Sequence, residues 1–249
     1  MNQPIRLSPN DTTQGNHEWR KLLILLKKFE ALINQMPASS TTTTPSRIRV
    51  FSHLDTKSQF LSLPLEFQQK AVLAFQFYVE TISAMIKAGE APTNSKRFLW
   101  RALQSLALIP LDNVFSQISD DDIIEVYSSE GIQIFRSFSF LETISYTIED
   151  LIVFPWHDLF TRDEKITELL IDQAVRLFNR EIEETRLNEI NYNHKIFESK
   201  SLEKRILLSR FGIVSPIKSK TPSSISYFVT TFKLFETDSA QNLAQHPEA

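Results

Sequence analysis

The sequence predicts an α+β fold in which an all-helical N-terminal region precedes an antiparallel sheet. Apolar residues recur every three or four positions in three segments within residues 17–112, which is the spacing of amphipathic helices. From Asp120 the apolar residues alternate instead, and residues 194–236 are rich in the β-branched and aromatic side chains typical of strands. A capped helical pattern lies between these two strand-like regions.

The first predicted helix begins near Glu18 and ends at Pro37. Its apolar stripe consists of Trp19, Leu22, Leu23, Leu26, Phe29, Ile33 and Met36. Residues 37–46 are too poor in apolar side chains to order themselves, so we expect a flexible linker there. The next stretch, RIRVF at residues 47–51, either forms a strand or docks on another element.

Two more helices are predicted in the N-terminal region. Residues 64–88 fit a helix because Pro64 suits its first turn and Gly89 suits the position just after its last turn. Residues 95–108 fit another helix, which Pro110 ends.

A hairpin and three further strands are predicted in the second half. Ile124 and Val126 share one face of the first strand, and Gly131 stands where a tight turn favours a residue with positive φ. The last third of the chain predicts an antiparallel meander of strands at residues 194–201, 204–214 and 224–236.

Three helical segments are predicted between the hairpin and the meander. Residues 138–144 form a short one, and Thr147 opens the second. Thr161 opens the third and longest, because Glu164 three residues later completes a capping box.

Composition excludes several classes of protein. A formal net charge of −3 gives no electrostatic reason to expect nucleic acid or an anionic membrane as a partner. Without cysteine there are no disulfides, cysteine nucleophiles or thiolate metal sites, and four glycines are too few for a phosphate-binding loop. The N-terminal residues lack the apolar core of a signal peptide, so we expect a cytoplasmic protein.

Local motifs in the second half resemble those of the PAS domain. They are Asp122-Ile123-Ile124 with Gly131 at the hairpin, Ser145-Tyr146-Thr147-Ile148-Glu149-Asp150-Leu151 before the long helix, and Leu159-Phe160 with Asp163-Glu164 at its start. The resemblance covers residues 115–237 and implies a five-stranded antiparallel sheet with helices on one face. It divides the chain into a tail at 1–16, a helical region at 17–112, a PAS-like sensor at 115–237 and a second tail at 238–249.

No catalytic residue and no metal site is predicted. The five histidines are isolated from one another, whereas ligands on a helix or strand recur two to four positions apart. His157 stands out because Asp158 follows it and because some PAS domains supply a haem-ligating histidine in this region. An unfamiliar hydrolase built on His157, Asp158 and Asp163 is therefore one alternative, and a surface or capping role for His157 is the other.

A ligand pocket is the favoured kind of site. The candidate lining residues are Phe135, Phe138, Phe160, Phe178, Phe228, Phe232 and His157, which either pack the core or border an apolar cavity. The lack of cysteine excludes the flavin-adduct and coumaroyl photosensors that the resemblance would otherwise suggest. Non-covalent flavin, haem and an apolar small molecule remain as ligand classes.

The function expected from these observations is signalling or regulation through a PAS-like sensor or interaction domain. Its output would pass through a protein partner or a homodimer, for which the stripe from Trp19 to Met36 is a candidate surface. That stripe could equally pack on the chain's own core. A ligand-free interaction adaptor and the hydrolase around His157 are the other two hypotheses.

Overall fold

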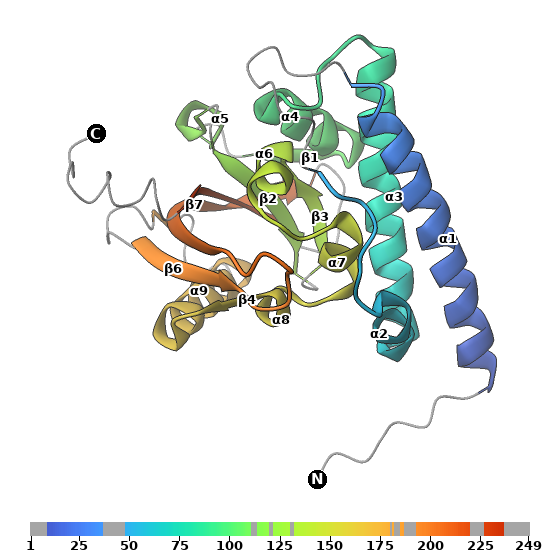
Figure 1. The fold of residues 1–249 in the computed structure, drawn as a ribbon. Helices are drawn as coiled ribbons and strands as arrows, with labels where there is room; N and C mark the ends of the chain where they lie inside the picture. The colour runs from blue at the N-terminus through green and yellow to red at the C-terminus, as the bar shows by residue number, and fades with distance from the viewer. Residues whose placement is uncertain are drawn as a thin grey trace.

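Helices form most of the first half of the chain, and most strands of one curled antiparallel sheet lie in the second half (Figure 1). This computed structural model describes residues 9–36, 48–110, 114–119, 122–129, 132–179, 181, 185–186, 193–219 and 227–236. The fold is therefore α+β. Three predictions fall outside the described residues. They concern the linker at 37–46, the start of the strand region at Asp120 and the turn residue Gly131.

The helices are α1 (Pro9–Ile33), α2 (Thr56–Ser62), α3 (Leu65–Lys87), α4 (Ser95–Ser105), α5 (Val114–Gln117), α6 (Phe138–Thr143), α7 (Ile148–Val153), α8 (Trp156–Leu159) and α9 (Glu164–Phe178). The strands are β1 (Leu108–Pro110), β2 (Ile123–Ser128), β3 (Gln133–Arg136), β4 (Phe160–Arg162), β5 (Thr185–Arg186), β6 (Asn193–Glu198), β7 (Ile206–Ser219) and β8 (Tyr227–Glu236).

The strands are ordered β3-β2-β8-β7-β6-β4, and every neighbouring pair is antiparallel. The hairpin of β2 and β3 therefore lies at one edge, and the short strand β4 lies at the other. The long strand β7 also pairs with β1 and with β5. Helix α9 packs on β7 through Leu177, which contacts Val214.

Helices α1 and α3 lie side by side along the β3 edge of the sheet (Figure 1). The apolar stripe of α1 faces inward, and Leu22, Leu26 and Phe29 are completely buried. The stripe thus packs on the chain's own core. Helix α1 also begins at Pro9, earlier than the predicted start at Glu18, so residues 9–16 are helical and are not part of a tail.

Single residues fix the two ends of helix α3. Pro64 is the N-cap of α3, and Gly89 after its C-terminus has a φ of +71°, which glycine adopts without strain. Helix α4 ends at Ser105, before the predicted end at Leu108. Leu108 instead begins β1, because it pairs with β7, a contact that sequence periodicity cannot reveal.

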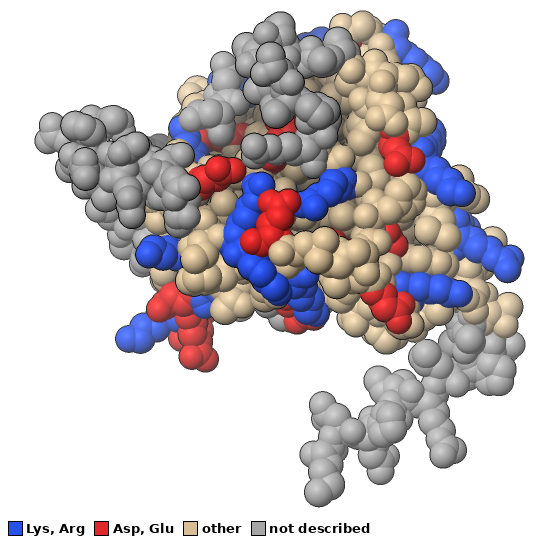
Figure 2. Space-filling view, viewed as in Figure 1, with Lys and Arg blue, Asp and Glu red and all other residues tan. Residues whose placement is uncertain are grey.

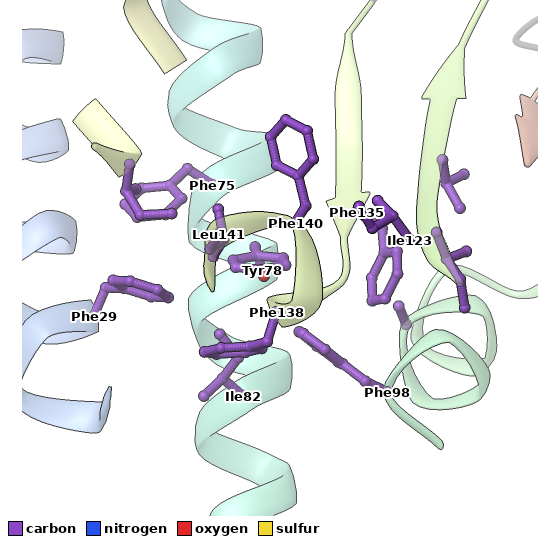
Figure 3. Close-up of a cluster of buried hydrophobic side chains, with 14 of the residues drawn as sticks. Phe29, Phe75, Tyr78, Ile82, Phe98, Ile123, Phe135, Phe138, Phe140 and Leu141 are labelled. Atoms are coloured by element: carbon purple, nitrogen blue, oxygen red, sulfur yellow. The ribbon is translucent and has the colours of Figure 1, made fainter. Parts of the chain in front are cut away.

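A cluster of aromatic rings joins the N-terminal helices to the sheet (Figure 3). Phe98 on α4 is at its centre, with ring centroids 4.7 Å from Phe135 on β3, 5.2 Å from Tyr78 on α3 and 5.8 Å from Phe138 on α6. Phe29 of α1 stacks on the same cluster, 6.2 Å from Phe138. Buried residues of both halves of the chain therefore belong to one continuous core.

The segment before α2 docks on the N-terminus of α7 and forms no strand. The carbonyl of Arg49 accepts a hydrogen bond of 3.0 Å from Ile148 N–H, and the carbonyl of Val50 accepts one of 3.1 Å from Glu149 N–H. The Glu149 carboxylate in turn accepts hydrogen bonds from Ser52 N–H at 2.8 Å and from the Thr56 hydroxyl at 2.5 Å. We call residues 48–52 the strap.

The two predicted helix caps have different outcomes. Thr147 caps α7 in a capping box with Asp150, as its position predicted. The prediction that Thr161 caps the long helix is wrong, because Thr161 lies in β4 and Asp163 is the N-cap of α9. Asp163 accepts hydrogen bonds from Lys165 N–H and Ile166 N–H, at 3.0 and 3.3 Å.

Replacing Gly212 with alanine is expected to lower the free energy of unfolding by about 1–3 kcal/mol. Gly212 lies at an irregularity between β7 and β8, where an added Cβ would overlap Thr231 Oγ1 and lie 3.2 Å from the Thr231 carbonyl oxygen. Thr231 Oγ1 cannot move away freely, because it accepts a hydrogen bond of 3.0 Å from Ile213 N–H. Urea unfolding measures the loss. Combining the change with Thr231→Ala should lose less than the sum of the two single variants, and additive losses would contradict this explanation.

Candidate functional site

An apolar cleft of about 520 Å³ lies between α3, the β2–β3 hairpin and the α7–α8 segment. A cleft of this volume is of the size that binds small organic molecules. From α3 and the residues before it, the lining includes Leu63, Pro64, Phe67, Ala71, Ala74, Phe75 and Tyr78. From the sheet and the short helices it includes Tyr127, Ile132, Gln133, Ile134, Phe135, Arg136, Leu141, Ile148, Leu151, Ile152, Val153, Phe154, Pro155, Trp156, Leu159 and Phe160.

The wall that α3 contributes follows from its sequence. Phe67, Ala71, Ala74 and Tyr78 are four, three and four positions apart, so they form one stripe on the helix. The two alanines in the middle of this stripe have small side chains. Space therefore remains between α3 and the hairpin where larger residues would close the packing.

Three polar residues of the lining, Tyr127, Gln133 and Arg136, lie on the β2–β3 hairpin. The Glu125 carboxylate accepts a hydrogen bond of 2.7 Å from Arg136 Nε and one of 2.8 Å from the Tyr127 hydroxyl. Gln133 Nε2 donates to the same hydroxyl at 3.0 Å, and the Tyr78 hydroxyl donates to the Arg136 carbonyl at 2.6 Å. Burial raises the pKa of Tyr127, and Glu125 raises it further, so its phenol is protonated at neutral pH.

A second arginine, Arg162, lies beside the lining residue Trp156 but does not itself line the cleft. Arg162 pairs with Ile196 across β4 and β6, and opposite residues of antiparallel strands share a face, so Arg162 points inward with the buried Ile196. Its guanidinium lies over the ring of Trp156, 4.7 Å from the centroid. Burial lowers the pKa of Arg162, while Tyr127 and Glu125 act on it in the opposite direction.

Arg162 is left with an unsatisfied donor. Its Nε is shielded from solvent and has no hydrogen-bond partner among the described residues. Other cations have ion-pair partners, as Arg49 does in Glu203 at 3.0 Å and Lys200 in Asp158 at 3.4 Å. Figure 2 shows Lys and Arg side chains beside Asp and Glu side chains in the middle of one face.

Two of the predicted pocket residues border this cleft. Phe135 on β3 and Phe160 on β4 both line it. Phe138 instead belongs to the aromatic cluster, and Phe232 packs on Phe140, with ring centroids 6.0 Å apart. These two phenylalanines therefore fill the core.

The other two predicted phenylalanines lie near α9. Phe228 on β8 stacks on Tyr127, with ring centroids 5.4 Å apart, and it packs toward α9. Phe178 is the last residue of α9. The structure describes its backbone but not its side chain.

The structure gives separate structural roles to two of the three hydrolase candidates. Asp163 caps α9, and Asp158 pairs with Lys200. The backbone of His157 lies in α8, and its side chain is outside the described part of the chain. Within the described ranges, no group of three or more His, Asp or Glu side chains is arranged to hold a metal ion.

Sequence reasoning missed the α3 wall, the lining residue Arg136 and the neighbouring Arg162. The sequence did contain a signal for this wall, because Ala71 and Ala74 are small residues in the middle of an apolar stripe on α3. Arg136 and Arg162 carried no such signal, because each is a single arginine beside a strand end, and only the pairing of the strands directs it inward.

Comparisons of the chain with protein-family models, with curated proteins and with solved structures gave no match. Among the helices in the described ranges, none combines the length and the apolar character needed to cross a bilayer.

Proposed function

We propose that this chain is a cytoplasmic signalling protein with a PAS-like sensor, and that a small, mainly apolar molecule binding the cleft is its signal. The observation that carries the proposal is the position of the cleft. It lies at the seam between the N-terminal helices and the sheet, with α3 as one wall and β3 as the other. A molecule bound there contacts both parts of the chain at once.

The route from the cleft to the outside of the protein runs through α3. Phe75 and Tyr78 line the cleft and also contact Phe29 of α1, with ring centroids 5.9 and 6.2 Å apart. A ligand that shifts α3 therefore also shifts the packing of α1. The mechanism is a change in the population of two packing arrangements of α1 and α3 against the sheet.

The arrangement of elements supports a PAS-like sensor. The described chain runs from a hairpin through three short helices and a longer helix to three strands, and five neighbouring strands, β3-β2-β8-β7-β6, are all antiparallel. This is the order of elements expected from the resemblance. The strands β1, β4 and β5 are additions to it.

The output side of the proposal is contact with a partner or a second copy through the N-terminal helices. The buried stripe of α1 cannot serve without opening the core. Ile24 on α1 and Leu73 on α3 are the residues suited to such contact, because they are 67% and 66% exposed.

Replacing Ala74 with phenylalanine is expected to weaken ligand binding by filling part of the cleft. Ala74 is half-buried and lines the cleft, so a phenyl ring at this position occupies the space of a ligand. Fluorescence of Nile red, a neutral apolar dye, measures binding to the wild-type chain and to the variant. We expect saturable binding by the wild type and at least about a tenfold loss of affinity in Ala74→Phe.

Ala84→Phe is the matched control, because Ala84 is an exposed alanine on the same helix. We expect this variant to bind the dye as the wild type does. Equal affinity of Ala74→Phe and the wild type for Nile red would show that the dye does not bind in the cleft, and would contradict the cleft as the ligand site. If neither Nile red nor a panel of flavin, haem and fatty acids bound the wild type, the ligand-free adaptor would replace the sensor.

A further inference from the structure

We propose that Ser52 is a phosphorylation site for a protein kinase that recognises arginine before serine, and that phosphate at Ser52 releases the strap from α7. This inference goes beyond the proposed function, because it requires no ligand in the cleft. The phosphate donor is ATP. The Ser52 hydroxyl oxygen forms a bond to the γ-phosphorus, and the bond from that phosphorus to the β–γ bridging oxygen breaks. ADP leaves, and the hydroxyl proton passes to a base of the kinase.

The sequence before Ser52 has the charge pattern of a kinase substrate. Arg47 and Arg49 lie five and three positions before Ser52, and no other serine or threonine in the sequence has arginine at both positions. Basophilic kinases select such substrates because carboxylates of the kinase pair with the guanidinium groups. Arg49 is exposed, and its ion pair with Glu203 is exposed on both sides, so a carboxylate of a kinase can replace Glu203 at little cost.

The strap is a segment that can open without disturbing a helix or the sheet. Residues 48–52 belong to neither, and their carbonyls accept two backbone hydrogen bonds from α7. Of the five strap residues, only Val50 is buried. Ser52 is half-buried, and the neighbouring Phe51 is 40% exposed. Few contacts therefore have to break before Ser52 is accessible to a kinase.

A phosphate at Ser52 would face two buried carboxylates. The Ser52 hydroxyl donates to Asp150, and Ser52 N–H donates to Glu149 Oε2 at 2.8 Å. These two acidic residues are 1% and 5% exposed, and within the described part of the chain all their hydrogen-bond donors are neutral N–H or O–H groups. Phosphorylation removes the hydrogen that Asp150 accepts and adds a charge of about −2 beside both carboxylates. Like charges repel strongly where water is excluded, so the phosphorylated strap leaves α7.

The N-terminus of α7 reports whether the strap is docked. Ile148 and Glu149 are the first two residues of this helix, so their N–H groups have no acceptor within it and donate to strap carbonyls instead. Phe154 N–H, in contrast, donates to the Asp150 carbonyl of α7 itself, at 2.9 Å. Release of the strap therefore exposes the first two amides to exchange and leaves Phe154 protected. Because Ile148 also lines the cleft, release alters that wall.

Incubation of the full chain with ATP and a basophilic serine kinase, followed by peptide mass spectrometry, tests the site. We expect the wild type to carry phosphate at Ser52 and Ser52→Ala to carry none. Arg49→Gln should lower the initial rate at least about tenfold, since a hydrogen bond between charged groups is worth that much. Glu203→Gln is the matched control, because it removes the same ion pair and keeps the arginine. This variant should be phosphorylated at least as fast as the wild type.

Hydrogen exchange measured by NMR on the phosphorylated chain tests the release of the strap. We expect the amides of Ile148 and Glu149 to exchange at least about tenfold faster than in the unmodified chain, and the amide of Phe154 to change less. Ser52→Ala is the control for the lost hydroxyl, because it removes the hydrogen bond to Asp150 without adding charge. Its acceleration of exchange at Ile148 and Glu149 should be smaller than that caused by phosphate.

Each part of the inference has its own contrary result. A wild-type chain that acquires no phosphate, or a phosphate that persists in Ser52→Ala, would overturn the modification site. Phosphate on Ser52 with unchanged exchange at Ile148 and Glu149 would overturn the release of the strap. Neither result bears on the sensor proposal, which depends on ligand binding by the unmodified chain.

Discussion

Replacing Phe98 with alanine is expected to lower the free energy of unfolding by about 3–5 kcal/mol. The Phe98 side chain is completely buried at the centre of the aromatic cluster, where it contacts Tyr78, Phe135 and Phe138. Its removal leaves a cavity that these rings cannot fill without moving α4 or β3. Urea unfolding followed by far-UV circular dichroism measures the loss, and Phe98→Leu should lose less because more of the volume remains.

Trp100→Ala is the control on the same helix. Trp100 is 42% exposed, so truncating this larger side chain is expected to lower the free energy of unfolding by about 1 kcal/mol or less. If Phe98→Ala were no more destabilising than Trp100→Ala, the cluster would not be the core that joins the two halves of the chain.

Replacing Glu198 with alanine is expected to lower the free energy of unfolding by about 3 kcal/mol. The carboxylate at the end of β6 is 2% exposed and accepts hydrogen bonds from Ser145 N–H at 2.7 Å, from the Ser145 hydroxyl and from the Ser201 hydroxyl at 2.9 Å. Alanine leaves these buried donors without an acceptor. Thermal and urea unfolding both measure the effect.

Two further variants show whether buried donors cause the loss. Glu198→Gln keeps one acceptor oxygen and should be intermediate between the wild type and Glu198→Ala. Glu203→Ala removes a carboxylate that is 41% exposed and pairs with Arg49 and Arg205, so a change of about 0–1 kcal/mol is expected. Similar losses in Glu198→Ala and Glu203→Ala would contradict the role given to Glu198.

Much of the α+β fold could be predicted from the sequence, because its signals are local. Helix α3 could be predicted from its own apolar stripe, the proline before it and the glycine after it. The start of α7 could likewise be predicted from Thr147 and the residues that follow it. The misplaced cap of α9 had a non-local cause. Thr161 and Asp163 are both good N-caps, and the pairing of β4 with β6 draws Thr161 into a strand.

The candidate site was less predictable than the fold. Phe135 and Phe160 were expected to face inward, but so were Phe138 and Phe232, and the sequence could not separate residues that fill the core from residues that border a cavity. Which helix covers the hairpin edge depends on tertiary packing, so the α3 wall could not be placed. The half-buried position of Arg162 depends on the register that sets it opposite Ile196, and a one-residue shift would point it to solvent.

The strap has a consequence for how this architecture can diverge. Arg49 and Val50 hold α7 through their backbone carbonyls, which every amino acid possesses. Substitutions at these two positions leave both carbonyl acceptors in place, so these two hydrogen bonds depend on the path of the backbone and not on the side chains. Distant homologues could keep these two backbone hydrogen bonds with other side chains at the exposed position 49, and their kinship would then be visible in superposed coordinates before it was visible in aligned sequences.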